Sequence, residues 1–154
     1  MLFRSFSFSA RYEILRGGYK RYCCCGANHA SIDILSDYAG RLDEIESVTL
    51  RIPKLANTMV GSVNSNAYTP ANIEQVQFSL PVQAAFALLG YGNGYQSHMD
   101  YLEDKLDMSR VRSAARKVKL VESPEMDKQY PGKFVTEATV TFLDGKVETA
   151  FVEN

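Results

Sequence analysis

The residues of this chain that could carry out chemistry are concentrated in residues 20–35, which read KRYCCCGANHASIDIL. This segment holds all three cysteines, in contiguous positions, and His29 follows four residues after the last of them. Zinc and iron–sulfur sites need ligand side chains that converge, whereas successive side chains on an extended segment point in alternate directions. Only Cys23 and Cys25 could share a face, and only His29 and His98 could add imidazole ligands. The pattern therefore predicts no metal site.

The cysteines leave two further interpretations, a reactive thiol or a structural role. Cys25 comes just before a predicted helix, and the positive end of a helix dipole lowers the pKa of a nearby thiol. The sequence offers no adjacent base and no Cys-x-x-Cys pair, so we favour packing of at least two of the three cysteines in the interior. Three contiguous cysteines do not form the pattern of a disulfide framework. We therefore expect free thiols in a reducing, cytoplasmic setting.

His29 is the stronger candidate for function in this segment. If Asn28 caps a helix that runs to about Ala39, His29 lies in the first turn. There, free backbone N–H groups and the helix dipole favour an anion and a neutral imidazole. A neutral histidine can act as a general acid or base, and Lys20 and Arg21 could add positive charge for a carboxylate ligand. The alternative is a histidine that only forms a hydrogen bond near a helix end, and spacing alone favours that structural role.

The elements that must position these residues follow from the hydrophobic pattern. After the helix over 28–39, a strand within residues 46–54 places alternate apolar side chains on one face. Residues 55–72, rich in Asn, Ser, Gly and Pro, predict a long loop. Residues 73–89 predict a buried helix, with a kink or break near Phe78–Leu80 because of Pro81, and the apolar members of FSLP are expected in the core.

The C-terminal half mixes helices and strands without a βαβ rhythm. Helices are expected near 97–104 and 109–117, the second capped by Asp107 or Ser109, and a short strand at 117–123. Two alternating runs then flank Asp144-Gly145, the sequence of a tight hairpin turn. Together these elements predict an α+β fold, a two-layer sandwich. In it a small antiparallel or mixed sheet has helices on one face and a C-terminal β-hairpin.

Composition limits the classes of function. The chain has 154 residues, a formal net charge of −1, 45% apolar and 23% charged residues, which is typical of one globular domain. The near-neutral charge does not favour nucleic acid or an anionic membrane as a partner, and no apolar run is long enough to span a bilayer. Apolar and polar residues alternate loosely over residues 2–15, a strand pattern. Residues 1–18 are therefore predicted to form an N-terminal arm or edge strand outside the main domain, which is residues 19–154.

Four segments, in order, give the chain a resemblance to the MmgE/PrpD family. YKRYCCCGANHASIDIL (residues 19–35) resembles the family's K-x-Y-P-C-C-x-x-x-H-x-x-I-D segment. DEIESVTLRIP (43–53) is similar to its I-x-x-V-x-V strand, and YTPANIEQVQFSLPVQAAFALLGYG (68–92) to its A-Q-F-S-L-P helix. Residues 107–149 are similar to the family's closing run, which ends in D-G. The resemblance covers about residues 19–152.

The resemblance implies a role for several residues. Family members include 2-methylcitrate dehydratase, cis-aconitate decarboxylase and iminodisuccinate epimerase, which abstract a proton next to a carboxylate and need no metal or nicotinamide cofactor. His29 occupies the position of the family's active-site histidine and Lys20 that of a lysine that could bind an anion. The loop from Val63 to Tyr68 aligns poorly with the family, and Tyr68 is a candidate because the resemblance implies a functional tyrosine near this loop. Cys23 stands where the family usually has proline, so the local backbone is expected to differ.

The resemblance covers the small C-terminal domain only. Family enzymes carry a large helical domain before it, and the active site lies between the two. We therefore expect an isolated domain of a lyase or isomerase acting on small polycarboxylates, inactive alone because the helical domain is missing. The alternative is a non-catalytic binding or oligomerisation module. The expected partners are a small carboxylate ligand, and either a second copy of the chain or a separately encoded helical domain.

Overall fold

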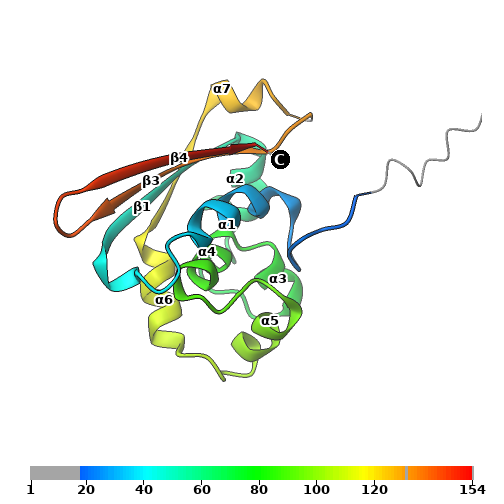
Figure 1. The fold of residues 1–154 in the computed structure, drawn as a ribbon. Coiled ribbons are helices and arrows are strands. Elements are labelled where there is room, and N and C mark those ends of the chain that lie inside the picture. Colours follow the sequence, from blue (N-terminus) through cyan, green and yellow to red (C-terminus); the bar gives the residue numbers. More distant parts are fainter. Residues whose placement is uncertain (1–17, 131, 154) are drawn as a thin grey trace, which may run out of the picture.

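The computed structural model describes residues 18–130 and 132–153, so the strand pattern of residues 2–15 lies outside the described residues. The chain forms two layers, a four-stranded sheet and a group of helices packed against one of its faces (Figure 1). This arrangement confirms the predicted α+β sandwich with a mixed sheet. Within the described residues, no helix has the length and apolar character needed to cross a bilayer.

The sheet has the strand order β2-β1-β3-β4 and combines one parallel pair with two antiparallel pairs. Its strands are β1 (Ile45–Ile52), β2 (Val118–Glu122), β3 (Val135–Phe142) and β4 (Val147–Glu153). Strands β1 and β3 pair antiparallel with Val48 opposite Val140, so that apolar side chains of both strands face the helices. Strands β3 and β4 form the predicted hairpin, in which Gly145 adopts a φ of 87° that favours glycine.

Helix α1 (His29–Ser36) lies between the sheet and helix α4, and its start differs from the prediction. A 3₁₀ turn, Gly26–Asn28, leads into the helix, and the backbone of Asn28 is already helical. The Asn28 side chain therefore makes no cap, and its Nδ2 donates to the carbonyl of Gln77 at 3.1 Å instead. The predicted Asn28 cap is wrong, and the His29 N–H already donates to the carbonyl of Gly26.

The segment predicted as a long loop contains a helix, α2 (Lys54–Val60), so that prediction is wrong for its first part. The predicted break in the next helical segment is confirmed. Helix α3 (Ile73–Gln77) ends just before α4 (Leu80–Leu89), whose first residues include Pro81. Ser79 caps α4 by accepting a hydrogen bond from the N–H of Val82 at 3.1 Å. Helix α4 is buried on nearly all sides between α1 and α6.

Among the described residues, three further helices follow α4 along the chain, and they pack against different elements. They are α5 (Tyr95–Leu102), α6 (Met108–Lys117) and the short α7 (Pro124–Asp127), which the sequence did not predict. Asp107 caps α6, because its Oδ1 accepts from the N–H groups of Ser109 and Arg110. This confirms the first of the two predicted caps.

Candidate functional site

The cysteine-containing segment lies along an open cleft of about 430 Å³. Residues 20–25 form one wall, and the other contributions come from Gln77 and Phe78 at the α3–α4 junction and from Gly94 before α5. The cleft therefore forms where three segments distant in sequence meet.

Backbone hydrogen bonds fix the segment in this position. The N–H of Cys23 donates to the carbonyl of Asn93, and the N–H of Cys25 donates to the carbonyl of Gln77, both at 3.0 Å. The Gln77 side-chain amide also reaches the Cys23 sulfur at 3.4 Å. These hydrogen bonds hold the segment against α3 and against the loop before α5.

A buried polar network holds that loop in turn. The Asn93 Nδ2 donates to both the backbone and the side-chain oxygen of Gln83, at 2.8 Å each. His98, fully buried, places Nδ1 2.5 Å from the carbonyl of Gly94 and Nε2 2.7 Å from the Gln83 amide nitrogen. Because a carbonyl can only accept, Nδ1 carries the proton and Nε2 accepts, so His98 is neutral. Burial lowers the pKa of His98, which agrees with this structural role.

The start of the segment is held on helix α1 by Asp33. The Arg21 guanidinium donates to Asp33 Oδ1 at 2.7 Å, and the Tyr22 hydroxyl donates to the same oxygen at 2.6 Å. Arg21 is largely exposed, so its ion pair adds little stability, whereas the Tyr22 hydroxyl is partly sheltered. Burial, and then the hydrogen bond to Asp33, raises the pKa of Tyr22.

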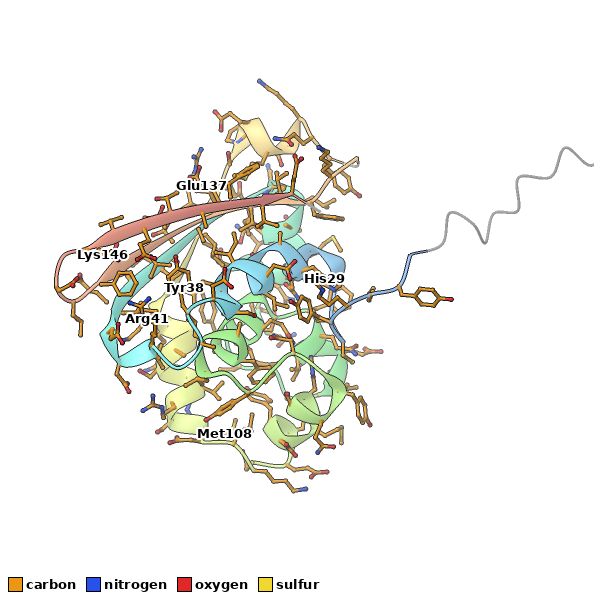
Figure 2. All side chains as sticks on the ribbon, in the orientation of Figure 1. His29, Tyr38, Arg41, Met108, Glu137 and Lys146 are labelled. Atoms are coloured by element: carbon orange, nitrogen blue, oxygen red, sulfur yellow. The ribbon has the colours of Figure 1, made fainter. Side chains whose placement is uncertain are left out.

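His29 lies behind this wall, at the start of α1 beside the N-terminal segment (Figure 2). Its ring meets the ring of Tyr22 edge to face, with centroids 5.2 Å apart. Its Nε2 is buried and has no hydrogen-bond partner among the described residues. Burial first, and then the positive charge of Lys20, lowers the pKa of His29, while Asp33 raises it. The imidazole is therefore neutral near pH 7, with one ring nitrogen unsatisfied.

The structure brings only some of the predicted site residues together. Lys20 lines the cleft, and its charge acts on His29, which itself sits one ring away from the cleft, behind Tyr22. Tyr68 lines a different cavity of about 200 Å³ beside Arg112 and Arg116 on α6. Burial raises the pKa of Tyr68, but nothing in the described arrangement places its hydroxyl with His29.

The cysteines contribute packing. Cys24 and Cys25 are buried, as the favoured interpretation predicted, and all three cysteines are free thiols. Burial raises the pKa of Cys24 to about 12, so its thiolate is not accessible at neutral pH. In the described part of the chain, no three His, Cys, Asp or Glu side chains are placed to hold a metal ion.

Sequence reasoning missed several residues that shape this site. Asp33 lies four residues after His29 on the same helix face, a spacing that could have indicated its role. Phe78 was expected in the core, but 40% of it is exposed and it lines the cleft, so that prediction is wrong. Phe78 is exposed and Leu80 is buried because the chain breaks between α3 and α4, which turns the Phe78 side chain outward.

Fold and site together define a small α+β domain with an open cleft that Lys20 and Tyr22 line, and with a neutral histidine, His29, in contact with Tyr22. A family model, the MmgE/PrpD C-terminal domain, matches residues 22–154. The chain belongs to the MmgE/PrpD family through this C-terminal domain, as the resemblance of its four segments predicted. A comparison with curated proteins gives no match.

Proposed function

We propose that the chain is the substrate-facing small domain of an MmgE/PrpD-type lyase or isomerase that acts on small polycarboxylates, as 2-methylcitrate dehydratase does. The observation that carries this proposal is the state of His29. Its imidazole is neutral, one ring nitrogen has no partner, and Lys20 lies close enough to lower its pKa. A base and a cation side by side are what proton abstraction next to a carboxylate requires.

In this proposal Lys20 binds a substrate carboxylate and His29 exchanges a proton with the adjacent carbon or orients the carboxylate. Proton abstraction leaves negative charge on the carboxylate side of the substrate, and a fixed cation stabilises that charge. The Asp33 contacts hold the wall that carries Lys20, and Tyr22 would have to turn aside to open a path to His29.

The proposal includes inactivity of the chain on its own. Elimination, decarboxylation and epimerisation each need an acid as well as a base, and at least one further cation for the second carboxylate. The cleft presents Lys20 as its free cation among the described residues, since Arg21 is bound to Asp33. A helical domain, on this chain or another, would supply the remaining groups.

The first test measures ligand binding by the chain itself. Citrate serves as the polycarboxylate probe, and NMR is the method that detects its binding. Citrate should shift the imidazole signals of His29 and leave those of His98 unchanged, because His98 is fully buried in its own network. Lys20→Gln should weaken the shift, whereas Lys54→Gln, a lysine of helix α2, should not. Unchanged His29 signals at saturating citrate would contradict the proposal. In parallel, 2-methylcitrate, cis-aconitate and iminodisuccinate should not be turned over, and turnover of any of them would disprove inactivity.

A second candidate function is a non-catalytic binding or oligomerisation module. The observation that favours it is a set of exposed aromatic side chains next to the cleft, Tyr19, Phe78 and Tyr95, of which Tyr95 is 61% exposed. Aromatic side chains at a surface are typical of protein interfaces. Light scattering at high concentration should then show self-association that Phe78→Ser and Tyr95→Ser abolish, and a monomer at all concentrations would argue against this module.

A further inference from the structure

A second cleft, of about 590 Å³, lies between helix α6 and the beginnings of strands β1 and β2. It shares no lining residue with the cleft at residues 20–25. Figure 2 shows the separation, with Met108 at the start of α6 well away from His29. The proposed function makes no use of this second cleft.

One face of α6 forms the wall of the cleft. Its exposed residues follow the spacing i, i+3, i+4 and i+7, which places them on one side of a helix, and the buried residues of α6 lie on the other side. The exposed stripe consists of Ser109, Arg112, Ser113 and Arg116. Ser47 of β1 adds a third hydroxyl from the sheet.

The cleft is strongly cationic although the whole chain has a net charge of −1. Four basic residues line it, Arg112, Arg116, Lys117 and Lys119, against a single carboxylate, that of Glu46. Like charges held close together repel, so such a cluster costs free energy unless an anion offsets it.

The arginines of this cleft differ from the others in the described part of the chain. Arg21, Arg41, Arg51 and Arg110 each form an ion pair with a carboxylate. Arg112 and Arg116 form none with any described residue. Both arginines line this cleft, and both also line the smaller cavity beside Tyr68.

Helix stabilisation accounts for only part of the cluster. Arg116 and Lys117 lie in the last turn of α6, where the dipole favours cations. The Lys117 ammonium is also used internally, since it donates to the carbonyls of Leu42 and Ile45. Arg112 lies one turn earlier and Lys119 belongs to β2, so the helix dipole explains neither.

We propose that this cleft is a binding site for a small phosphorylated ligand. Guanidinium groups bind phosphate oxygens in a bidentate fashion, and the serine hydroxyls can donate to the oxygens that remain. A phosphate offers three peripheral oxygens where a carboxylate offers two, which suits a site with two arginines, a lysine and three hydroxyls. Glu46 in the same cleft disfavours an extended polyanion such as nucleic acid.

The test uses inorganic pyrophosphate as the probe and citrate as a tricarboxylate control, measured by calorimetry at low ionic strength. We expect one pyrophosphate site per chain, with amide NMR shifts at Ser109 and Ser113. Arg112→Gln and Arg116→Gln should each weaken binding about tenfold, the loss expected for one charge-assisted hydrogen-bonding partner. Arg110→Gln is the matched control on the same helix, because Arg110 is paired with Asp43, and it should bind as the unmodified chain does.

Three results would overturn the proposal. These are the absence of saturable pyrophosphate binding, affinity that the Arg112 and Arg116 variants leave unchanged, and citrate binding in this cleft as tightly as pyrophosphate does. The replaced residues are exposed, so circular dichroism should report folded variants. NMR mapping on the unmodified chain locates the bound pyrophosphate without any substitution. Failure here leaves the His29 proposal unaffected, because citrate shifts at His29 are measured separately.

Discussion

The ring of Tyr22 meets the ring of His29 at an interplanar angle of 81°, with centroids 5.2 Å apart, and Tyr22 lines the cleft together with Lys20 whereas His29 does not. The Tyr22 hydroxyl is at the same time bound to Asp33. One side chain therefore both packs against the candidate base and connects the cleft wall to helix α1.

The first prediction concerns the pKa of His29. It should titrate below the ordinary value of 6.5, chiefly because of burial and then because of Lys20. Lys20→Gln should raise the pKa only part of the way back, since burial remains, and Asp33→Asn should lower it further, since Asp33 raises it. NMR titration of the imidazole signals measures all three. A His29 pKa above 6.5 in the unmodified chain would contradict this assignment of causes.

The second prediction is a loss of stability on acidification. His29 and His98 both have pKa values lowered from 6.5 in the folded state, so below pH 6.5 the unfolded chain binds more protons than the folded chain. The free energy of unfolding should therefore be greatest above that pH and fall as the pH drops from 6.5 toward the folded-state values. Urea denaturation at several pH values tests this. His29→Gln should reduce the pH dependence without removing it, because His98 remains, and a stability that rises on acidification in this window would refute the prediction.

The third prediction isolates the hydrogen bond between Tyr22 and Asp33. Tyr22→Phe keeps the ring against His29 and removes only the hydroxyl, so it should lower the free energy of unfolding by about 1 kcal/mol. Hydrogen exchange should also become faster in residues 20–25, which this contact helps to hold. Tyr95→Phe is the control, because Tyr95 is exposed and forms no hydrogen bond through its hydroxyl with the described residues. Equal effects of the two variants would show that the contact with Asp33 contributes nothing.

Elements of the fold could be predicted from the sequence where the residues that determine them are close together in the chain. The hairpin follows from alternation around Asp144-Gly145, the α6 cap from Asp107, and the break before α4 from Pro81. Each of these depends on residues a few positions apart, so one sequence suffices to find it.

The failed prediction at Asn28 depends on a contact between distant segments. Asn28 was expected to cap α1, but its side chain bonds to Gln77, 49 residues away. The network of Gln83, Asn93 and His98 that supports the cleft corresponds to no sequence motif, and the sequence indicated His98 only as a possible metal ligand. The position of Lys20 and His29 in one neighbourhood was predictable from their proximity in the chain, whereas the turn of Phe78 toward the cleft was not.

The fourth prediction concerns Ser79, which connects the loop before α3 to the start of α4. Its Oγ accepts from the N–H of Val82 and donates to the carbonyl of Ala67, in a fully buried position. Ser79→Ala loses a helix cap and leaves the Ala67 carbonyl without this partner, so the free energy of unfolding should fall by about 2 kcal/mol or more. Chemical denaturation measures the change. Ser65→Ala, in the exposed part of the same loop, should change stability by less than about 0.5 kcal/mol.

The fifth prediction concerns the thiols. Burial raises the pKa of Cys24 to about 12 and encloses it, so it should not react with a thiol reagent at pH 8 in the folded chain. Cys25 is buried as well, whereas Cys23 is partly exposed at the cleft, so Cys23 should react first. Mass spectrometry after brief labelling identifies the modified position, and labelling in denaturant should reach all three. Rapid modification of Cys24 in the folded chain would mean that the segment opens readily. The contacts of Cys23 with Asn93 and of Cys25 with Gln77 would then be too weak to keep Lys20 and His29 in place.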